Sequence, residues 1–241
     1  MSVFAMGDLH LSFSVEKPMD IYGGEWIDHT TRVAENWNSL VKEEDTVILA
    51  GDSSWALRFE ESLLDLQWIS KLPGKKIFFK GNHDLWWSSA NKLNKIDERM
   101  TFIQNKFVQL ESQGKAYAIC GTRGWICPGD DGFTKQDEKI YKRELGRFQL
   151  SLEAAASLGY GGKDAKKGRI VCCLHFPPTN DKHQGSGFTE LCTDYGVETL
   201  VYGHLHGKEA YKNGIQGIYN GVDYKLVSLD YLKCRPLKII E

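Results

Sequence analysis

The sequence lacks long apolar runs and any leader-like start. No stretch of its 241 residues approaches the ~18 consecutive apolar residues that a membrane-spanning helix needs. The start, Met1 to Met6, has no basic segment, and Gly7 and Asp8 end its apolar run early. The sequence therefore predicts no signal peptide, no membrane association and a cytoplasmic location.

The sequence also lacks an excess of basic residues. It has 30 Lys and Arg against 32 Asp and Glu, which gives a net charge of −2. A protein that coats nucleic acid or a membrane surface would show a basic excess. Nucleic acid is therefore not an expected partner, although a local basic patch stays open.

Cysteine pairs at metal-binding spacing are absent too. None of the six cysteines forms a Cys-x-x-Cys pattern, and Cys172 and Cys173 are neighbours inside an apolar run. We interpret all six as reduced, mostly buried thiols, which excludes a disulfide framework and a structural zinc site. The cysteines are Cys120, Cys127, Cys172, Cys173, Cys192 and Cys234.

With 41% hydrophobic residues, the chain has enough apolar side chains for one sizeable core. It contains no internal repeat, low-complexity segment or linker, so residues 1–241 are predicted to form a single domain. Strands are predicted at 2–6, 46–50 and 76–80, with helices at 30–41 and 59–71 between them. This alternation predicts an α/β fold with parallel strands and right-handed crossovers.

The rest of the chain predicts further elements and one long loop. The loop covers residues 12–28, which contain Gly23, Gly24 and Pro18 and show little periodicity. The other predicted elements are helices at 88–99, 138–158 and 188–195, strands near 102 and at 107–110, 117–120, 169–174 and 198–202, and antiparallel-like strands at 217–220 and 224–229.

Metal-capable side chains follow five of the predicted strands. They are Asp8 and His10, Asp52, Asn82, His175, and His204 with His206. Singly, Asp52 reads as a turn residue and His175 as a core histidine. Because open α/β sheets bind ligands at the carboxyl ends of their parallel strands, the shared placement favours one common site.

The residue types point to two divalent metal ions. In an extended segment, residues two positions apart face the same way, so Asp8 and His10, or His204 and His206, can reach one ion. Carboxylate, amide and imidazole donors without thiolates suit Mn²⁺, Fe²⁺ or Zn²⁺. Seven donors are too many for one ion. Two ions ~3.5–4 Å apart can share a carboxylate and hold a hydroxide for in-line attack on phosphorus.

Taken as a series, these motifs resemble those of the calcineurin-like metallophosphoesterase superfamily. The series is Gly-Asp-x-His, Gly-Asp, Gly-Asn-His-Asp, His and Gly-His-x-His, in the order of the family and across residues 7–207. The resemblance implies a four-layer α/β/β/α sandwich of two mixed sheets flanked by helices. The remaining chain is similar to small bacterial members known only as predicted phosphohydrolases.

The resemblance also implies a role for each motif residue. One metal ion would be held by Asp8, His10, Asp52 and His206, and the other by Asp52, Asn82, His175 and His204, with Asp52 bridging. His83 matches the non-ligand histidine that contacts the phosphoryl group and protonates the leaving oxygen. Asp84 stands where the family has an acidic residue that orients this histidine.

The implied function is that of a dinuclear metal-dependent phosphohydrolase. A metal-bridging hydroxide would hydrolyse a phosphomonoester or phosphodiester of a small soluble substrate. The alternatives are a nuclease of the same superfamily, a non-catalytic metal-binding scaffold and a protein phosphatase. The charge balance and short C-terminus argue against a nuclease, and the intact Asn82 and His83 argue against a scaffold. The sequence leaves the physiological substrate, the resident metals and the oligomeric state open.

Other segments near the motifs have two readings each. We predict that residues 121–133 form a substrate-facing wall, in which Arg123 grips a phosphate oxygen and Trp125 stacks on an organic group. Alternatively, Arg123 is a surface ion-pair partner and Trp125 a core residue. Trp86 and Trp87 either line the site or pack in the core. His29 is expected to cap or precede a helix, or to support the metal ligands.

Overall fold

In a computed structural model, which describes residues 1–162 and 165–241, the chain forms two mixed β-sheets. The first has the strand order β11-β1-β2-β3-β4. Its strands are β1 (Val3–Met6), β2 (Thr46–Ala50), β3 (Lys75–Phe79), β4 (Met100–Phe102) and β11 (Leu237–Ile240). Strands β1 to β4 are parallel, and β11 runs antiparallel to β1. The predicted parallel order of the first three strands is therefore confirmed.

The second sheet has six strands in the order β5-β6-β7-β8-β10-β9. They are β5 (Val108–Ser112), β6 (Lys115–Gly121), β7 (Gly168–Cys173), β8 (Val197–Tyr202), β9 (Gly217–Tyr219) and β10 (Val222–Leu226). The central strands β6, β7, β8 and β10 are parallel, and the edge strands β5 and β9 are antiparallel to their neighbours.

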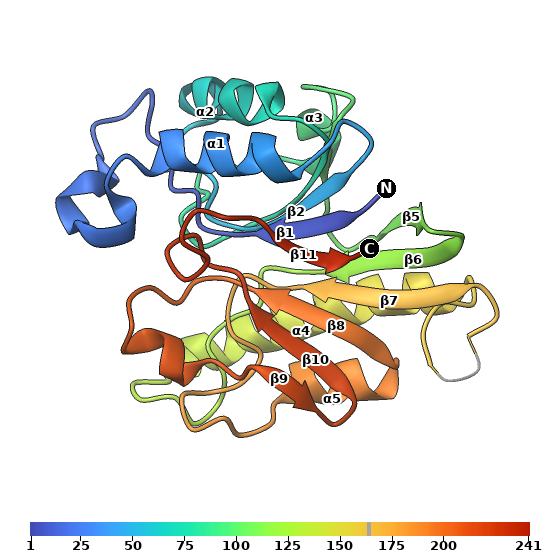
Figure 1. The fold of residues 1–241 in the computed structure, drawn as a ribbon. Coiled ribbons are helices and arrows are strands. Elements are labelled where there is room, and N and C mark those ends of the chain that lie inside the picture. Colours follow the sequence, from blue (N-terminus) through green and yellow to red (C-terminus); the bar gives the residue numbers. More distant parts are fainter. Residues whose placement is uncertain (163–164) are drawn as a thin grey trace.

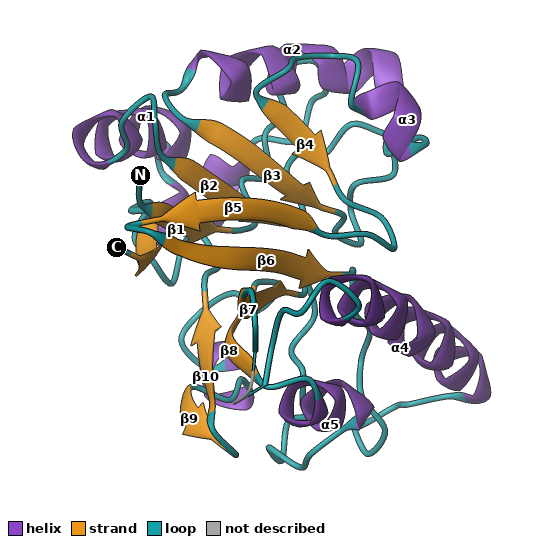
Figure 2. Cartoon of the chain, turned by 90° about the vertical axis from the view of Figure 1, so that its right-hand side faces the viewer, coloured by secondary structure: helices purple, strands orange, loops and turns teal. Residues whose placement is uncertain are grey.

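Helices cover the outer face of each sheet (Figures 1 and 2). Helices α1 (His29–Leu40), α2 (Phe59–Lys71) and α3 (Ala90–Leu93) lie on the first sheet, and α4 (Lys135–Ala156) and α5 (Gly187–Asp194) on the second. Short 3-10 helices are η1 (Met19–Tyr22), η2 (Gly24–Trp26) and η3 (Ala210–Asn213). The predicted four-layer α/β/β/α sandwich is confirmed.

Three apolar clusters hold the four layers together. Because successive strand residues point to opposite faces, one buried strand serves two clusters. In β2, Val47 and Leu49 pack toward the helices of the first sheet, and Ile48 and Ala50 pack between the two sheets. This double burial explains why the central strands read as unbroken apolar runs. A third cluster joins the second sheet to α4 and α5.

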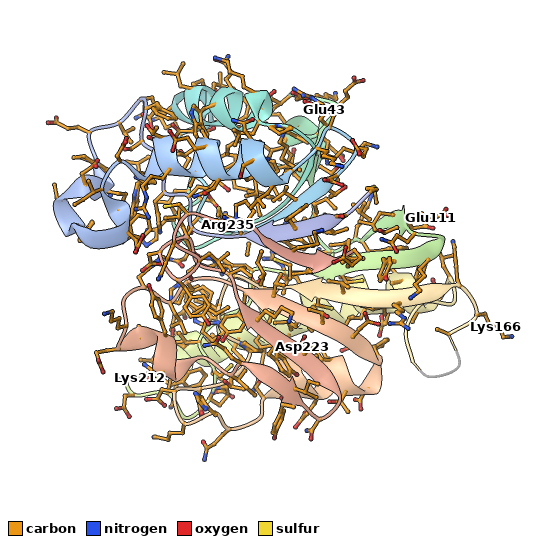
Figure 3. All side chains as sticks on the ribbon, in the orientation of Figure 1. Glu43, Glu111, Lys166, Lys212, Asp223 and Arg235 are labelled. Carbon is orange, nitrogen blue, oxygen red and sulfur yellow. The ribbon has the colours of Figure 1, made fainter. Side chains whose placement is uncertain are left out.

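The surface and the thiols match the composition. Charged side chains such as Glu43, Glu111 and Lys212 are exposed and point outward (Figure 3). All six cysteines are buried and free, as predicted. Among the described residues, none of the helices has both the length and the apolar composition needed to span a bilayer.

Two predicted elements differ from the structure. The helix expected at 88–99 is only the four-residue α3, because the Asn94 side chain bonds the backbone of Phe102 at 2.7 and 3.2 Å and draws the chain out of the helix. The strand expected at 224–229 is β10, which pairs parallel to β8 and antiparallel only to β9. The antiparallel pairing expected for this region is confirmed between β9 and β10, and the parallel pairing of β10 with β8 was not predicted. The single-domain extent stays a prediction.

Candidate metal centre

The seven expected metal ligands lie together at the carboxyl ends of β1, β2, β3, β7 and β8, the left-hand rim in Figure 1. Among the described residues, two groups of donor atoms lie within 4.8 Å of one another. One group comprises Asp8, His10 and His206, and the other Asp8, Asp52 and His175. Residues separated by almost 200 positions in the sequence therefore share one site.

The first group forms around His206. Its Nε2 lies 3.4 Å from His10 Nε2 and 3.6 Å from Asp8 Oδ1. The Nε2 of His10 is in turn 3.8 Å from Asp52 Oδ2. Two ring nitrogens and two carboxylates thus face one point, which is the donor set expected for the first ion.

The second group forms around His175. Its Nε2 lies 2.7 Å from Asn82 Oδ1, 3.2 Å from His204 Nδ1 and 3.3 Å from Asp52 Oδ2. This is the donor set expected for the second ion. The Oδ2 atom of Asp52 therefore lies between His10 of the first group and His175 of the second.

The backbone that presents these donors is strained. Four of the expected ligands have the left-handed conformation that non-glycine residues rarely adopt: Asp8 (φ 61°), His10 (46°), Asp52 (50°) and His204 (73°). Such strain persists where the surrounding structure enforces it and is concentrated at functional sites. Parallel strands alone would not aim these side chains at one another.

Two motif glycines make room for the carboxylates. A Cβ atom on Gly81 would lie 2.0 Å from Asp52 Oδ1, and one on Gly203 would lie 2.4 Å from Asp8 Oδ2. Both distances are far below van der Waals contact. Glycine is therefore required before Asn82 and before His204, which explains the Gly-Asn-His-Asp and Gly-His-x-His spacing physically.

Hydrogen bonds fix the ring orientation of two histidines. The Nδ1 of His175 lies 2.9 Å from the Ala50 carbonyl, and the Nδ1 of His206 lies 2.9 Å from Asp230 Oδ1. In each ring, an Nδ1–H that donates to this oxygen leaves the Nε2 lone pair facing the other donors. Partners of this kind commonly orient metal-binding histidines.

Asp230 is a supporting residue that sequence reasoning missed. Besides His206, its carboxylate accepts hydrogen bonds from Gly207 N at 2.9 Å and Tyr211 Oη at 2.7 Å. It lies in the irregular segment after β10, outside any motif. Asp230 therefore holds both the His206 ring and the backbone that follows it at the end of the Gly-His-x-His motif.

The electrostatics of the site favour a cation. Burial lowers the pKa of His10 and of His204 to about 3, so both rings are neutral at pH 7, as metal binding requires. Burial also opposes a charge on Asp52, but His175 and His10 outweigh it and hold the pKa of this carboxyl below its usual range. Burial alone would lower the pKa of His175, yet Asp52 and Asp8 raise it to about 9. The carboxylates thus attract positive charge, which a metal ion supplies by replacing this proton.

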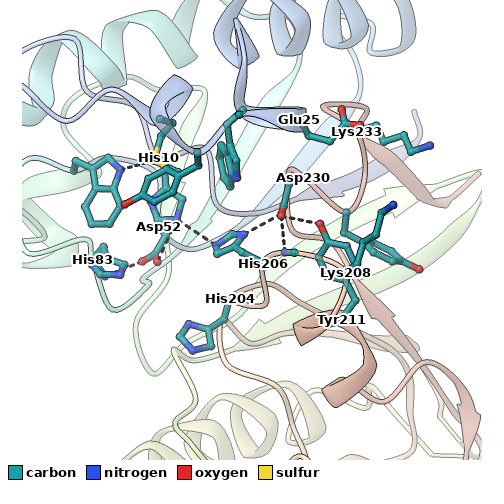
Figure 4. Close-up of a pocket in the computed structure, with 18 residues that line it drawn as sticks. His10, Glu25, Asp52, His83, His204, His206, Lys208, Tyr211, Asp230 and Lys233 are labelled. Carbon is teal, nitrogen blue, oxygen red and sulfur yellow. Dashed lines mark hydrogen bonds and ion pairs between the residues drawn. The ribbon is translucent and has the colours of Figure 1, made fainter.

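The donor groups open into a cavity of about 1000 Å³ (Figure 4). We call it the histidine cavity; its polar floor is formed by His10, Asp52, His83, His204 and His206. Its walls are largely aromatic: Trp55 stacks on His10 with ring centroids 4.6 Å apart, and Trp26 meets His206 edge-on at 5.3 Å. The site therefore combines metal-capable donors with room for an organic molecule.

His83 lies in this cavity without belonging to either donor group. Its backbone N–H donates to Asp52 Oδ1 at 2.8 Å, which places the ring beside the candidate bridging carboxylate. The ring is exposed to the cavity and packs against Trp55 with centroids 4.3 Å apart. His83 is thus free to approach a molecule in the cavity.

The position of Asp84 corrects the role expected for it. Its buried carboxylate accepts bonds from the backbone N–H groups of Gly81, Asp52, Ser53 and Ser54 at 2.8 to 3.3 Å, and from Trp86 Nε1 at 3.0 Å. Among the described residues it makes no hydrogen bond with the His83 ring. Because all its bonds hold backbone and Trp86, Asp84 joins the two loops that carry Asp52 and Asn82.

The predicted substrate-facing wall is also corrected. The guanidinium of Arg123 stacks 4.5 Å above the Trp125 ring and pairs with Glu144 at 3.3 Å. Arg123 lines a different cavity, and Trp125 packs against the core of the second sheet. Arg123 is therefore a largely buried ion-pair partner and not the surface one of the alternative reading, and Trp125 packs against the core; Glu144 holds the guanidinium away from the histidines.

The remaining aromatic candidates support the site from outside. Trp86 is buried in the first core, and Trp87 packs against the same cluster. His29 begins α1, and its ring nitrogens face the carbonyls of Leu9 and Trp26 at 3.1 and 3.2 Å. His29 thus ties the segment between Asp8 and His10 to the aromatic wall.

This fold and donor set are those of a metal-dependent hydrolase that acts on phosphoester bonds. The model of the calcineurin-like phosphoesterase family matches residues 1–208. The chain belongs to this family, whose members typically bind divalent metals.

Relatives of known sequence or structure agree with the fold. The Gene 66 protein of Mycobacterium phage L5 is 32% identical over 77 residues, which are 32% of this chain and 37% of that protein, so the match spans only about a third of each. The phosphopantetheinyl hydrolase of Mycobacterium tuberculosis has a TM-score of 0.59 at 17% identity and covers 99% of this chain and 95% of its own. The AQ665 protein of Aquifex aeolicus has a TM-score of 0.51 at 15% identity, covering 98% and 95%.

Proposed function

We propose that this chain holds two divalent metal ions with Asp52 between them and hydrolyses a phosphomonoester or phosphodiester of a small soluble molecule. The observation that carries the proposal is the position of Asp52 Oδ2, 3.8 Å from His10 Nε2 and 3.3 Å from His175 Nε2. The proposed sets are Asp8, His10, Asp52 and His206 for one ion and Asp52, Asn82, His175 and His204 for the other.

The donor chemistry fits first-row divalent ions. Carboxylates, an amide oxygen and imidazoles suit Mn²⁺, Fe²⁺ or Zn²⁺, and the Nε2 atoms of His175 and His206 face the other donors of the site. Two such ions supply the positive charge and activated water that attack on a phosphoester requires.

His83 is the proposed proton donor to the leaving group. Its ring faces the cavity beside Asp52, and burial lowers its pKa. An anionic phosphoryl group next to the ring favours the protonated form again, because an opposite charge stabilises imidazolium. Asp84 makes no hydrogen bond with the ring among the described residues, but its carboxylate holds the loop that carries His83 against the loop that carries Asp52.

The shape of the histidine cavity supports a small organic substrate. Its volume of about 1000 Å³ and its aromatic walls suit a molecule of a few rings. Lys208 and Lys233 also line it and offer positive charge at the side away from His83 (Figure 4). A substrate with an anionic or polar tail next to its phosphoester would fit these walls.

Hydrolysis by manganese-loaded protein tests the proposal directly. The substrates are p-nitrophenyl phosphate, bis-p-nitrophenyl phosphate, a cyclic nucleotide and single-stranded DNA, with the Asp52→Asn variant as the control. We expect metal-dependent turnover of at least one small ester and its loss in the variant. Turnover of DNA alone would favour a nuclease, and no turnover of any ester by metal-loaded protein would favour the scaffold reading.

A further inference from the structure

A second cavity lies beside the segment that carries Asn82 and His83. Its volume is about 300 Å³, and it is bounded by the carboxyl ends of β3, β4 and β6 and by the middle of α4. We call it the arginine cavity; its charged lining consists of Lys80, Arg123, Arg143, Glu144 and Arg147. The metal centre uses none of these side chains.

The arginine cavity has more positive than negative charge. Glu144 is buried, and its Oε1 pairs with Arg147 at 2.8 Å, Arg123 at 3.3 Å and Arg143 at 3.4 Å. Its Oε2 accepts from the Thr122 hydroxyl at 2.8 Å. The charged lining thus contains four cationic side chains and one carboxylate, which leaves three positive charges without a counter-charge in the cavity lining.

Two polar atoms at this cavity have no partner. The Nε of Arg123 and the Oγ of Ser88 are buried and make no hydrogen bond with the described residues. Lys80 likewise makes no ion pair within the described chain, which covers all of α4. Buried polar atoms are nearly always bonded in folded proteins, so two residues that line this cavity keep hydrogen-bonding capacity that the described chain does not use.

We propose that the arginine cavity binds a phosphate group. A guanidinium donates two parallel hydrogen bonds to neighbouring phosphate oxygens, and stacking on Trp125 already fixes the plane of Arg123. A phosphate dianion matches the surplus of positive charge more closely than a carboxylate, which has one charge and two oxygens. The volume admits inorganic phosphate and also the phosphate of a small organic molecule.

The site is joined to the metal centre through backbone. The carbonyl of Arg123 accepts bonds from the N–H groups of His175 at 2.9 Å and Phe176 at 3.0 Å. Lys80 precedes Asn82 by two residues. A phosphate bound there would therefore lie against segments that present two of the expected metal ligands, while remaining outside the histidine cavity.

A matched pair of double variants on α4 tests the proposal. Arg143→Gln with Arg147→Gln removes two cations from the cavity, while Lys139→Gln with Lys142→Gln removes two exposed cations elsewhere on the helix. Binding of labelled inorganic phosphate to the metal-loaded full chain is measured by equilibrium dialysis. We expect the arginine pair to weaken one class of phosphate sites at least tenfold and the lysine pair to leave the isotherm unchanged. Equal isotherms for the two double variants would overturn the proposal.

Two further measurements distinguish a loss of phosphate binding from a loss of stability and identify the type of phosphate that binds. Lys80→Gln should lower phosphate affinity without lowering the melting temperature, because this ammonium has no ion pair to lose. Phenylphosphonate, which contains no ester bond to hydrolyse, stands for an organic phosphate. For each probe, the binding affinities of the arginine and lysine double variants are compared. A larger difference in affinity with phenylphosphonate identifies an organic ligand, and a larger difference with inorganic phosphate identifies inorganic phosphate. Equal binding by both pairs with both probes contradicts a phosphate site.

Discussion

The histidine and arginine cavities lie at the same strand-end rim but have opposite chemistry. At the floor of the histidine cavity, donors of the kind that bind metals converge: His206 Nε2 lies 3.4 Å from His10 Nε2, which lies 3.8 Å from Asp52 Oδ2. In the arginine cavity, N–H groups surround a single carboxylate. The strands therefore determine where polar residues gather, while the residue types determine whether the missing partner is a cation or an anion.

Two buried carboxylates make this difference concrete. Glu144 is compensated inside the chain, because three guanidinium groups and Thr122 bond its oxygens. The Oδ1 atom of Asp52 accepts a hydrogen bond from the backbone N–H of His83. Its Oδ2 atom lies close to the imidazoles of His10 and His175. A buried charge needs compensation. For Glu144 the chain provides it with permanently charged guanidinium groups, whereas for Asp52 it provides only imidazoles, which a divalent metal ion would supplement.

The largest effect is expected for Asp52→Asn. The amide keeps the shape of the side chain but removes the charge that the two ions would share. Metal ions contribute several kcal/mol to transition-state stabilisation, so we expect kcat/KM to fall on the order of 10⁴-fold. Hydrolysis of p-nitrophenyl phosphate under saturating Mn²⁺ measures this loss. A variant within tenfold of the parent protein would show that Asp52 is not a bridging ligand.

A somewhat smaller effect is expected for His83→Ala. General acid catalysis is typically worth ~10²–10⁴-fold, and it matters most when the leaving group is basic. The variant should therefore lose more rate on alkyl phosphates than on p-nitrophenyl phosphate, and it should retain its metal. A series of esters graded by leaving-group pKa measures this. A rate loss that is the same across the series would remove His83 as the acid.

Glu144→Gln is expected to lower stability and spare activity, which is the opposite of the result expected for Asp52→Asn. The amide leaves three guanidinium groups without their carboxylate, and breaking a buried ion pair costs about 3–5 kcal/mol. We expect the free energy of unfolding in urea to fall by this amount, while kcat/KM stays within a few-fold at a temperature where the variant is folded. Loss of metal in Glu144→Gln would show that the two cavities are not separate.

An effect on activity smaller than those of Asp52→Asn and His83→Ala is expected for Asp230→Asn. The amide still accepts one bond but no longer holds the imidazole of His206 with a charged partner. Loss of such a supporting residue typically costs 10–100-fold in metal affinity or activity. A titration of apo-protein with Mn²⁺ should show weaker binding of one ion, with the other unaffected. Equal weakening of both ions would place Asp230 in a general structural role.

The convergence of the seven expected metal ligands was predictable because each stands where an apolar run stops. A parallel strand order brings such ends together, so Asp52 and His175 could be placed at one site from the sequence. Arg123 was placed at the correct rim for the same reason. Its cavity could not be predicted, since that depends on Glu144, which lies 21 residues later on a helix whose orientation the periodicity does not give.

Other features were invisible for different reasons. Asp230 lies 24 residues after its partner His206 in an irregular segment, where no periodic pattern marks it. The strand β11 has only four residues, and its pairing with β1 joins the two ends of the chain. The short α3 depends on side-chain bonds of Asn94 that compete with the helix. Each of these depends on contacts between distant residues, which local sequence patterns do not encode.

The most direct test of the central claim is the manganese content of three purified proteins. The parent chain, Asp52→Asn and Glu144→Gln are saturated with Mn²⁺, freed of unbound ion and measured by elemental analysis. A centre bridged by Asp52 predicts two ions per chain in the parent and in Glu144→Gln, and one or none in Asp52→Asn. One ion per chain in all three proteins, or two ions in a fully active Asp52→Asn, would contradict it.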